Sequence, residues 1–273
     1  MKTELKSRRR FVGEAALLAA VPTILSAAPK PKKWESLFDG KTTKGWHKTP
    51  KRGRHGTGGH WFVKDGVLHG EQDPPGSGNG GILLSDRKFG DFELELEMNP
   101  DWGPCSGVFF RCTEEGDGFQ MYVDYHDRGN VGHLRGEMKK SFALMPFKIF
   151  GETGADGKLT SLRSEPDPRK AKWPEGVYKK ICAAGDWLKA WKVGEWNHCR
   201  LRCVGKYPRV NVWLNGLHIA DWDGNSCTLP DYDKERTFKN IGRKGSIGLQ
   251  VHGGKGWPKG AQVRWRNIRV REL

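Results

Sequence analysis

The sequence lacks any apolar run long enough to cross a membrane. Its longest apolar segment extends from Ala15 to Ala28, has 14 residues and is interrupted by Pro22. A transmembrane helix needs about 20 apolar residues to span the hydrocarbon core. We therefore expect no stable membrane span.

Cysteine is present, but not in a pattern that indicates cross-links or a zinc finger. The chain has six cysteines and no CxxC pair. Cys199 and Cys203 fall in one expected strand, where four residues at about 3.3 Å each separate their backbones by roughly 13 Å, too far for a disulfide. A chain of this length can bury a sufficient core without cross-links, so we expect free thiols.

Several catalytic and nucleic-acid-binding motifs are also missing. The chain has no GxSxG nucleophile elbow and no HExxH helix, and its glycine-rich run at residues 74–81 lacks the Lys-Ser/Thr ending of a phosphate loop. No helix-turn-helix, zinc-finger or RNA-binding signature accompanies the net charge of +15, so no nucleic-acid partner is expected. Glu93, Glu95 and Glu97 alternate with apolar residues, which is typical of a solvated strand rather than of paired glycosidase carboxylates.

A basic segment stands directly before the apolar one. The motif SRRRF at residues 7–11 precedes Ala15–Ala28, and small residues end the segment just before Pro29. This order predicts a twin-arginine export signal over residues 1–28, and a periplasmic or otherwise exported protein that leaves the cytoplasm folded. A buried N-terminal helix is the alternative.

Residues 29–273 remain after cleavage and have the length of a single large sandwich or barrel. The leader holds five basic and two acidic residues, so the remaining charge is about +12. Such a charge favours anionic partners in general. A basic surface protein that binds anionic polymers therefore stays open as a hypothesis.

The mature chain is a series of short β-type runs separated by Gly, Asn, Asp and Pro, which predicts an all-β fold. Residues 92–98 (FELELEM) alternate strictly, and Asn215-Gly216 predicts a tight hairpin turn. A change of apolar phase near Arg266 and Asn267 predicts a β-bulge. The remaining expected strands are 61–63, 67–69, 81–84, 107–111, 119–125, 198–204, 246–251 and 263–270.

About ten strands without an internal repeat favour a two-sheet sandwich over a propeller, and we prefer jelly-roll topology. The segment at about 138–192 interrupts the strand rhythm and is predicted to be an insertion. Its aromatic residues favour a folded flap, or alternatively a cover over the sandwich.

Alternation also predicts a polar sheet face. In residues 119–126, the apolar side chains share one face and Gln120, Tyr122, Asp124 and His126 share the other. Residues 246–253 place Gln250 and His252 on a polar face in the same way. Arg111 can join them if the strand at 107–111 lies in the same sheet. Donors, a cation and candidate acids and bases would then converge, although a plain solvent-facing sheet surface alternates similarly.

Eight sequence motifs, in order, carry a family resemblance. They are ESLFDGKTTKGW, WFVKDGVLHGE, FGDFELELE, SGVFFR, GEWNHCRL, VWLNGLHIADW, GSIGLQVHGG and WRNIRVREL. The chain resembles the 3-keto-disaccharide hydrolase family over about residues 35–273, apart from the insertion. The resemblance implies a concanavalin A-like jelly-roll β-sandwich of two antiparallel sheets. It also implies action on 3-keto-glucosides as a 1,2-lyase, as a 3-keto-2-hydroxy-glucal hydratase, or as both in net hydrolysis.

In that chemistry a ketone at C3 acidifies the hydrogen on C2, and the enolate then expels the glycosidic oxygen from C1. The site needs a base, an acid, and a cation or divalent metal ion for the enolate. The matching motifs assign Arg111 to the enolate, His252 to proton transfer and Gln250 to substrate binding. The partner would be a 3-keto-sugar or glycan.

The chain departs from the family at one strand. Gln120-Met121-Tyr122 stands where the family commonly has Glu-x-Gln. Asp124 or His126 is expected to replace the missing acid, with Gln120 and Tyr122 binding substrate. The alternative is a non-catalytic glycan-binding module on the same sandwich.

The leader gives the first prediction. Changing Arg8 and Arg9 to Lys should abolish export of the folded protein, because the twin-arginine pair is what that route recognises. Export is measured by fractionating cells and detecting the mature chain. Persistent export of the double variant would contradict the folded-export hypothesis.

Overall fold

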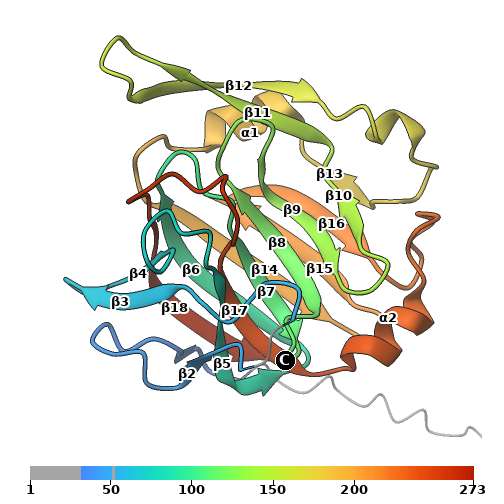
Figure 1. Ribbon diagram of the computed structural model, residues 1–273. Coiled ribbons are helices and arrows are strands. Elements are labelled where there is room, and N and C mark those ends of the chain that lie inside the picture. The colour runs from blue at the N-terminus through green and yellow to red at the C-terminus, as the bar shows by residue number, and fades with distance from the viewer. Residues whose placement is uncertain (1–31, 51–52) are drawn as a thin grey trace, which may run out of the picture. The chain divides into compact units, whose positions relative to one another are not determined.

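The computed structural model describes residues 32–50 and 53–273. The predicted export signal at residues 1–28 therefore lies outside the described residues. Within the described ranges, no helix is long and apolar enough to span a bilayer. The described chain is nearly all β, and two large antiparallel sheets confirm the predicted sandwich (Figure 1).

In the described part of the chain, one sheet has nine strands. Its spatial order is β13 (Lys180–Ile181), β16 (Leu217–Asp223), β15 (Arg209–Leu214), β14 (Asn197–Val204), β6 (Phe92–Pro100), β18 (Val263–Glu272), β4 (Val67–Glu71) and β3 (His60–Lys64), with β1 (Glu35–Ser36) paired to β18. Strands that are far apart in the chain lie side by side in this sheet, as β14 does beside β6 and β6 beside β18.

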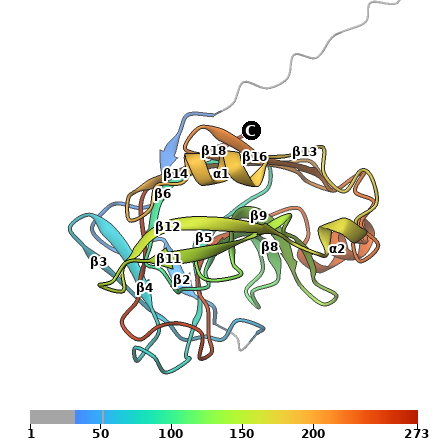
Figure 2. The same ribbon diagram turned by 90° about the horizontal axis from the view of Figure 1, so that it is seen from above.

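The second sheet has seven strands among the described residues and carries the candidate site. Its spatial order is β10 (Phe142–Leu144), β9 (Asn130–Glu137), β8 (Gly118–Asp124), β7 (Gly107–Cys112), β17 (Gly245–Val251), β5 (Gly81–Phe89) and β2 (Trp46–Lys48). Figure 2 shows β14, β16 and β18 in one layer and β5, β8 and β9 in the other.

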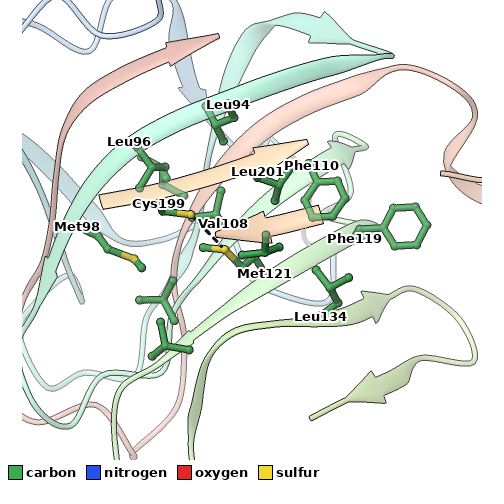
Figure 3. Packing of buried hydrophobic residues seen from close by; sticks show 14 of the residues in the cluster. Leu94, Leu96, Met98, Val108, Phe110, Phe119, Met121, Leu134, Cys199 and Leu201 are labelled. Atoms are coloured by element: carbon green, nitrogen blue, oxygen red, sulfur yellow. Dashed lines mark hydrogen bonds between the residues drawn. The ribbon is translucent and has the colours of Figure 1, made fainter. Parts of the chain in front are cut away.

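The core lies between the inner faces of the two sheets. In Figure 3, Leu94, Leu96 and Met98 of β6 face side chains of β7 and β8. Cys199 of β14 contacts Met121 of β8, with Sγ and Sδ 3.4 Å apart. Burial of these side chains stabilises the sandwich by about 25 cal/mol for each Å² of apolar surface.

Two local predictions are confirmed. Asn215 and Gly216 have φ values of 48° and 85° and join β15 to β16 as the predicted hairpin. The pairing of β18 with β6 shifts between Arg266 and Arg269, and Asn267 has a φ of 53°, so the predicted bulge is present. All six cysteines are free, as expected.

The glutamates of β6 lie opposite the apolar face as predicted, but they are ion-paired rather than freely solvated, and Glu93 is buried. Glu93, Glu95 and Glu97 form ion pairs with arginines of the flanking strands β14 and β18 on the outside of the nine-stranded sheet. The arginines are Arg200, Arg202, Arg266, Arg269 and Arg271.

The segment predicted as an insertion is folded. It contains β10, the hairpin of β11 (Phe147–Thr153) and β12 (Leu159–Pro166), the 3₁₀ turn η1 (Lys170–Lys172), β13 and the helix α1 (Ala184–Ala190). The remaining helix, α2 (Lys234–Ile241), lies outside it. Trp187 of α1 is buried and donates from Nε1 to the backbone oxygen of Val131 at 2.9 Å. The aromatic residues of the insertion therefore cover the sandwich, which was the alternative to a folded flap.

Candidate functional site

The candidate site lies on the face of the seven-stranded sheet that is turned away from the core, here called the outer face. In β8, Phe119, Met121 and Val123 belong to the core as predicted, which leaves Gln120 and Tyr122 on the outer face. In β17, Leu249 and Val251 likewise face the core and Gln250 faces outward. Alternation thus predicted correctly which of these side chains in β8 and β17 face the core.

Arg111 is the exception, and its assignment to this face is wrong. The pairing of β7 with β17 shifts, since Gly248 pairs with Phe109 but Ser246 pairs with Cys112. The extra residue in β7 places Arg111 at a φ of 49° and breaks the alternation there. Phe109 and Cys112 consequently share the outer face in one apolar cluster, while Arg111 does not.

The Arg111 side chain is fully buried and paired. Its guanidinium donates to the backbone oxygens of Gly90 at 3.1 Å, Gly205 at 2.7 Å and Lys206 at 3.2 Å. It also forms an ion pair with Asp91 at 3.2 Å. These partners belong to the loops at the ends of β6 and β14, so Arg111 ties the two sheets together and is not available to a substrate.

The outer face holds a directed chain of hydrogen bonds. Gln120 Nε2 donates to Gln250 Oε1 at 2.7 Å, and Gln250 Nε2 lies 3.0 Å from His55 Nδ1. An amide nitrogen only donates, so Nδ1 of His55 accepts and the ring proton lies on Nε2. Burial, with Coulombic contributions from His252, Arg54 and Arg135, lowers the pKa of His55 to about 3. His55 is therefore a neutral imidazole, and its Nε2 is buried without a hydrogen-bond partner among the described residues.

A cation of β9 lies beside this chain. Arg135 pairs with Glu137 and donates to the Tyr122 hydroxyl at 3.4 Å. Burial raises the pKa of Tyr122 to about 12, so its phenol is protonated. The positive charge expected from Arg111 is supplied on this face by Arg135.

Asp124 and His126 lie together at the end of β8, with Cys105. The Cys105 thiol donates to Asp124 Oδ1 at 3.0 Å. One ligand atom from each of Cys105, Asp124 and His126 falls within 4.8 Å of the others. Burial raises the pKa of Asp124. In the described part of the chain this is the one such group of three potential metal ligands.

His252 joins two neighbouring cavities. One, of about 720 Å³, is lined by Trp102, Cys105, His126 and Trp257 among others. The other, of about 480 Å³, is lined by Arg54, His55 and Asn79 among others. His252 lines both. Its Nδ1 lies 2.5 Å from the Gly253 carbonyl oxygen, so Nδ1 carries the proton and Nε2 keeps a lone pair.

The insertion contacts residues that line the larger cavity. The backbone nitrogen of Gly151 in β11 donates to Asp127 Oδ1 at 2.9 Å, and Asp127 lines the cavity beside His126. A Cβ at Gly151 would come within 2.6 Å of the Trp102 indole, another cavity residue. The insertion therefore buttresses the loop that carries His126.

The residues of the site that were not found from sequence include Arg135, Glu137, His55 and Cys105. Arg135 and Glu137 alternate with Leu134 and Gly136 in β9, a pattern that indicates a polar strand face. Gly132 and Gly136 interrupt the apolar residues of this strand and make the alternation hard to recognise. His55 has no local signal, because it lies in a loop and reaches Gln250, 195 residues away. Of the predicted residues, His126 and His252 line the two cavities. The others lie behind the lining: Gln250 and Gln120 contact His55 in series, Asp124 contacts Cys105, and Tyr122 contacts Arg135. Arg111 is left out.

Fold and site together define a jelly-roll sandwich with a polar site on the outer face of one sheet. Residues 33–271 match the 3-keto-alpha-glucoside-1,2-lyase-like domain, and the chain belongs to this family. It is 34% identical over 259 residues to the 3-keto-disaccharide hydrolase of Bacteroides thetaiotaomicron, with 87% of this chain and 78% of that protein covered. These two findings support a glycosyl-hydrolase-like function.

A solved structure shows the same fold. It is a putative glycosyl hydrolase from Parabacteroides distasonis, with a TM-score of 0.50 and 17% sequence identity. The match covers 88% of this chain and 94% of the solved one.

The position of Arg111 predicts a stability effect. Arg111→Met should lower the free energy of unfolding by about 3–5 kcal/mol, because it leaves Asp91 and three backbone oxygens short of a buried donor. Arg163→Met is the control, since its ion pair with Glu165 is exposed and contributes about 0–1 kcal/mol. Denaturant titration measures both, and equal effects would contradict the structural role.

Two buried histidines, His55 and His133, are predicted to be neutral. His133 is buried beside Asn130 Oδ1 at 3.0 Å and also has a pKa lowered to about 3. Neither His55 nor His133 should titrate between pH 5 and 8 in NMR spectra. Nitrogen shifts should show the proton on Nε2 of His55 and on Nδ1 of His133. A titration of His55 near pH 6.5 would contradict the chain.

The lowered pKa values of His55 and His133 also predict how the stability of the fold depends on pH. Between about pH 3 and pH 6.5 each imidazole binds a proton in the unfolded chain but not in the folded one. Their contribution to stability is therefore complete above pH 6.5 and is lost as the pH falls toward 3.

Proposed function

We propose that this protein is an exported enzyme that cleaves 3-keto-glucosides by elimination and hydration, with net hydrolysis. Family membership and the name of the 34% identical relative support this class of substrate. The observation that carries the proposal is the outer face itself. There His252, with a free lone pair, lines two neighbouring cavities, and the neutral donor His55 lines the smaller one. Arg135 adds positive charge beside them.

His252 is the proposed base. Its Nδ1–H is held by the Gly253 carbonyl, which leaves Nε2 to accept the proton from C2 of the keto-sugar. The enolate that forms expels the glycosidic oxygen from C1, and that oxygen takes the proton back from the His252 imidazolium. Water then adds across the C1–C2 double bond, C1 gains the hydroxyl and C2 regains a proton.

His55 and Arg135 are proposed to hold the C3 oxygen as negative charge develops. The Gln120–Gln250 chain fixes the His55 proton on Nε2. The neutral imidazole can therefore donate a hydrogen bond from Nε2 to the C3 oxygen. Arg135 adds positive charge to the same face. Together they take the role that the sequence had assigned to Arg111.

The cavity walls suit a sugar. Trp102 and Trp257 line the larger cavity, and Lys255, His126 and His252 add polar groups to it. Carbohydrate sites combine aromatic surfaces for sugar C–H groups with polar groups for hydroxyls. Gln120, Tyr122 and Gln250 remain the proposed substrate-binding residues, the first and last also as members of the hydrogen-bond chain.

A non-catalytic glycan-binding module is the second candidate. The observation in its favour is Gln120, an amide at the strand position where the family commonly has an acid. The two candidates agree on the cavities and differ in turnover.

The deciding assay uses the purified protein with 3-keto-trehalose or 3-keto-lactose and the unoxidised disaccharides as controls. Formation of the conjugated enone is followed by its absorbance. His252→Ala should lower turnover by about 10²–10⁴-fold, because it removes the base. His60→Ala is the matched control, since His60 lies on β3 in the other sheet and pairs with Glu71. Unchanged turnover by His252→Ala would reject the assigned base, and keto-sugar binding without turnover by the wild type would favour the binding module.

A further inference from the structure

Cys105, Asp124 and His126 form a compact group at one end of the outer face. The Sγ, carboxylate and imidazole atoms lie within 4.8 Å of one another, and the Cys105 Sγ is 3.0 Å from Asp124 Oδ1. Zinc–ligand bonds of about 2.0–2.3 Å place the ligands of a tetrahedral ion about 3.3–3.6 Å apart. Small side-chain rotations are therefore enough to place one ion among the three atoms.

We propose that Cys105, Asp124 and His126 bind a single Zn²⁺ ion. Sulfur, nitrogen and oxygen donors together suit this borderline-soft ion, whereas Mg²⁺ and Ca²⁺ take oxygen ligands. On binding, the ion would replace the thiol proton that Cys105 now donates to Asp124 Oδ1.

The orientation of His126 agrees with this role. Its Nδ1 lies 2.7 Å from the Asp127 carbonyl oxygen, so Nδ1 carries the proton and Nε2 presents a lone pair. Ligating histidines in metal sites usually have their second ring nitrogen held in this way. Asp127 is held in turn by the Gly151 backbone of the insertion.

The backbone holds Cys105 in position beside Asp124. The segment that carries Cys105 pairs with the end of β8 on both sides of it, because Tyr125 N donates to Pro104 O at 3.0 Å and Val123 N donates to Ser106 O at 3.0 Å. Two of the ligands are therefore fixed by main-chain hydrogen bonds rather than by flexible side chains. Such preorganisation lowers the cost of binding the ion.

The group borders the larger cavity. Cys105 and His126 both line the cavity of about 720 Å³, and His252 lines it as well. Three protein ligands with a fourth position open to a cavity is the arrangement of catalytic rather than structural zinc. The ion would hold a sugar oxygen or a water near His252; this role rests on the proposed function, whereas the binding of the ion does not.

The test measures metal binding first. The full-length protein is stripped with a chelator, incubated with Zn²⁺ and dialysed, and its zinc content is measured. One zinc per chain is expected. Cys105→Ser and His126→Gln should each weaken binding by more than the about 10–100-fold that follows loss of a group which merely orients a ligand. Cys182→Ser is the matched control, because Cys182 is a half-buried free cysteine outside the group.

Cobalt gives a signature of the sulfur ligand. Co²⁺ in place of Zn²⁺ should produce a thiolate-to-metal charge-transfer band in the near ultraviolet that Cys105→Ser removes and Cys182→Ser keeps. Circular dichroism and thermal melting check that the variants are folded. Absence of stoichiometric zinc, or zinc binding that survives both Cys105→Ser and His126→Gln, would overturn the site.

The activity arm separates this site from the proposed function. Stoichiometric zinc in a protein that does not turn over any 3-keto-glucoside rejects the proposed function and keeps the site. Turnover by a chelator-treated protein that binds no zinc rejects the site and keeps the function.

Discussion

The alternation of side chains across the seven-stranded sheet is the constraint on which the rest of this structure depends. One face must close an apolar core against the nine-stranded sheet, so the other face receives every second residue of the same strands. In β8 this places Met121 in the core and Gln120 and Tyr122 outside. The polar groups of β8 and β17 therefore lie on the outer face because their neighbours along each strand fill the apolar core.

Burial on both faces gives the polar groups their chemical character. Gln120, Gln250 and Tyr122 are each at most 4% exposed, so each must find a partner or pay for desolvation. The Gln120–Gln250–His55 chain meets that need and at the same time selects one tautomer of His55. The requirement to satisfy buried polar atoms thus produces an oriented donor at the cavity.

The bulge in β7 shows how one residue redistributes function. With regular alternation, Arg111 would have supplied the cation of the outer face. The extra residue turns it toward loop carbonyls, where its guanidinium donates to the backbone oxygens of Gly90, Gly205 and Lys206. Arg135 of β9 then remains as the arginine that contacts Tyr122.

The sequence by itself determined the fold class, the Asn215-Gly216 hairpin, the bulge near Asn267 and the polar faces of β8 and β17, because each depends on local periodicity or turn geometry. Only the tertiary structure decided which strands are neighbours, where Arg111 points, and that His55 meets Gln250 while Cys105 meets Asp124. Those contacts join residues far apart in the chain or depend on the register of one strand against another. A one-residue shift in register reverses which face a side chain occupies, and no local pattern records it.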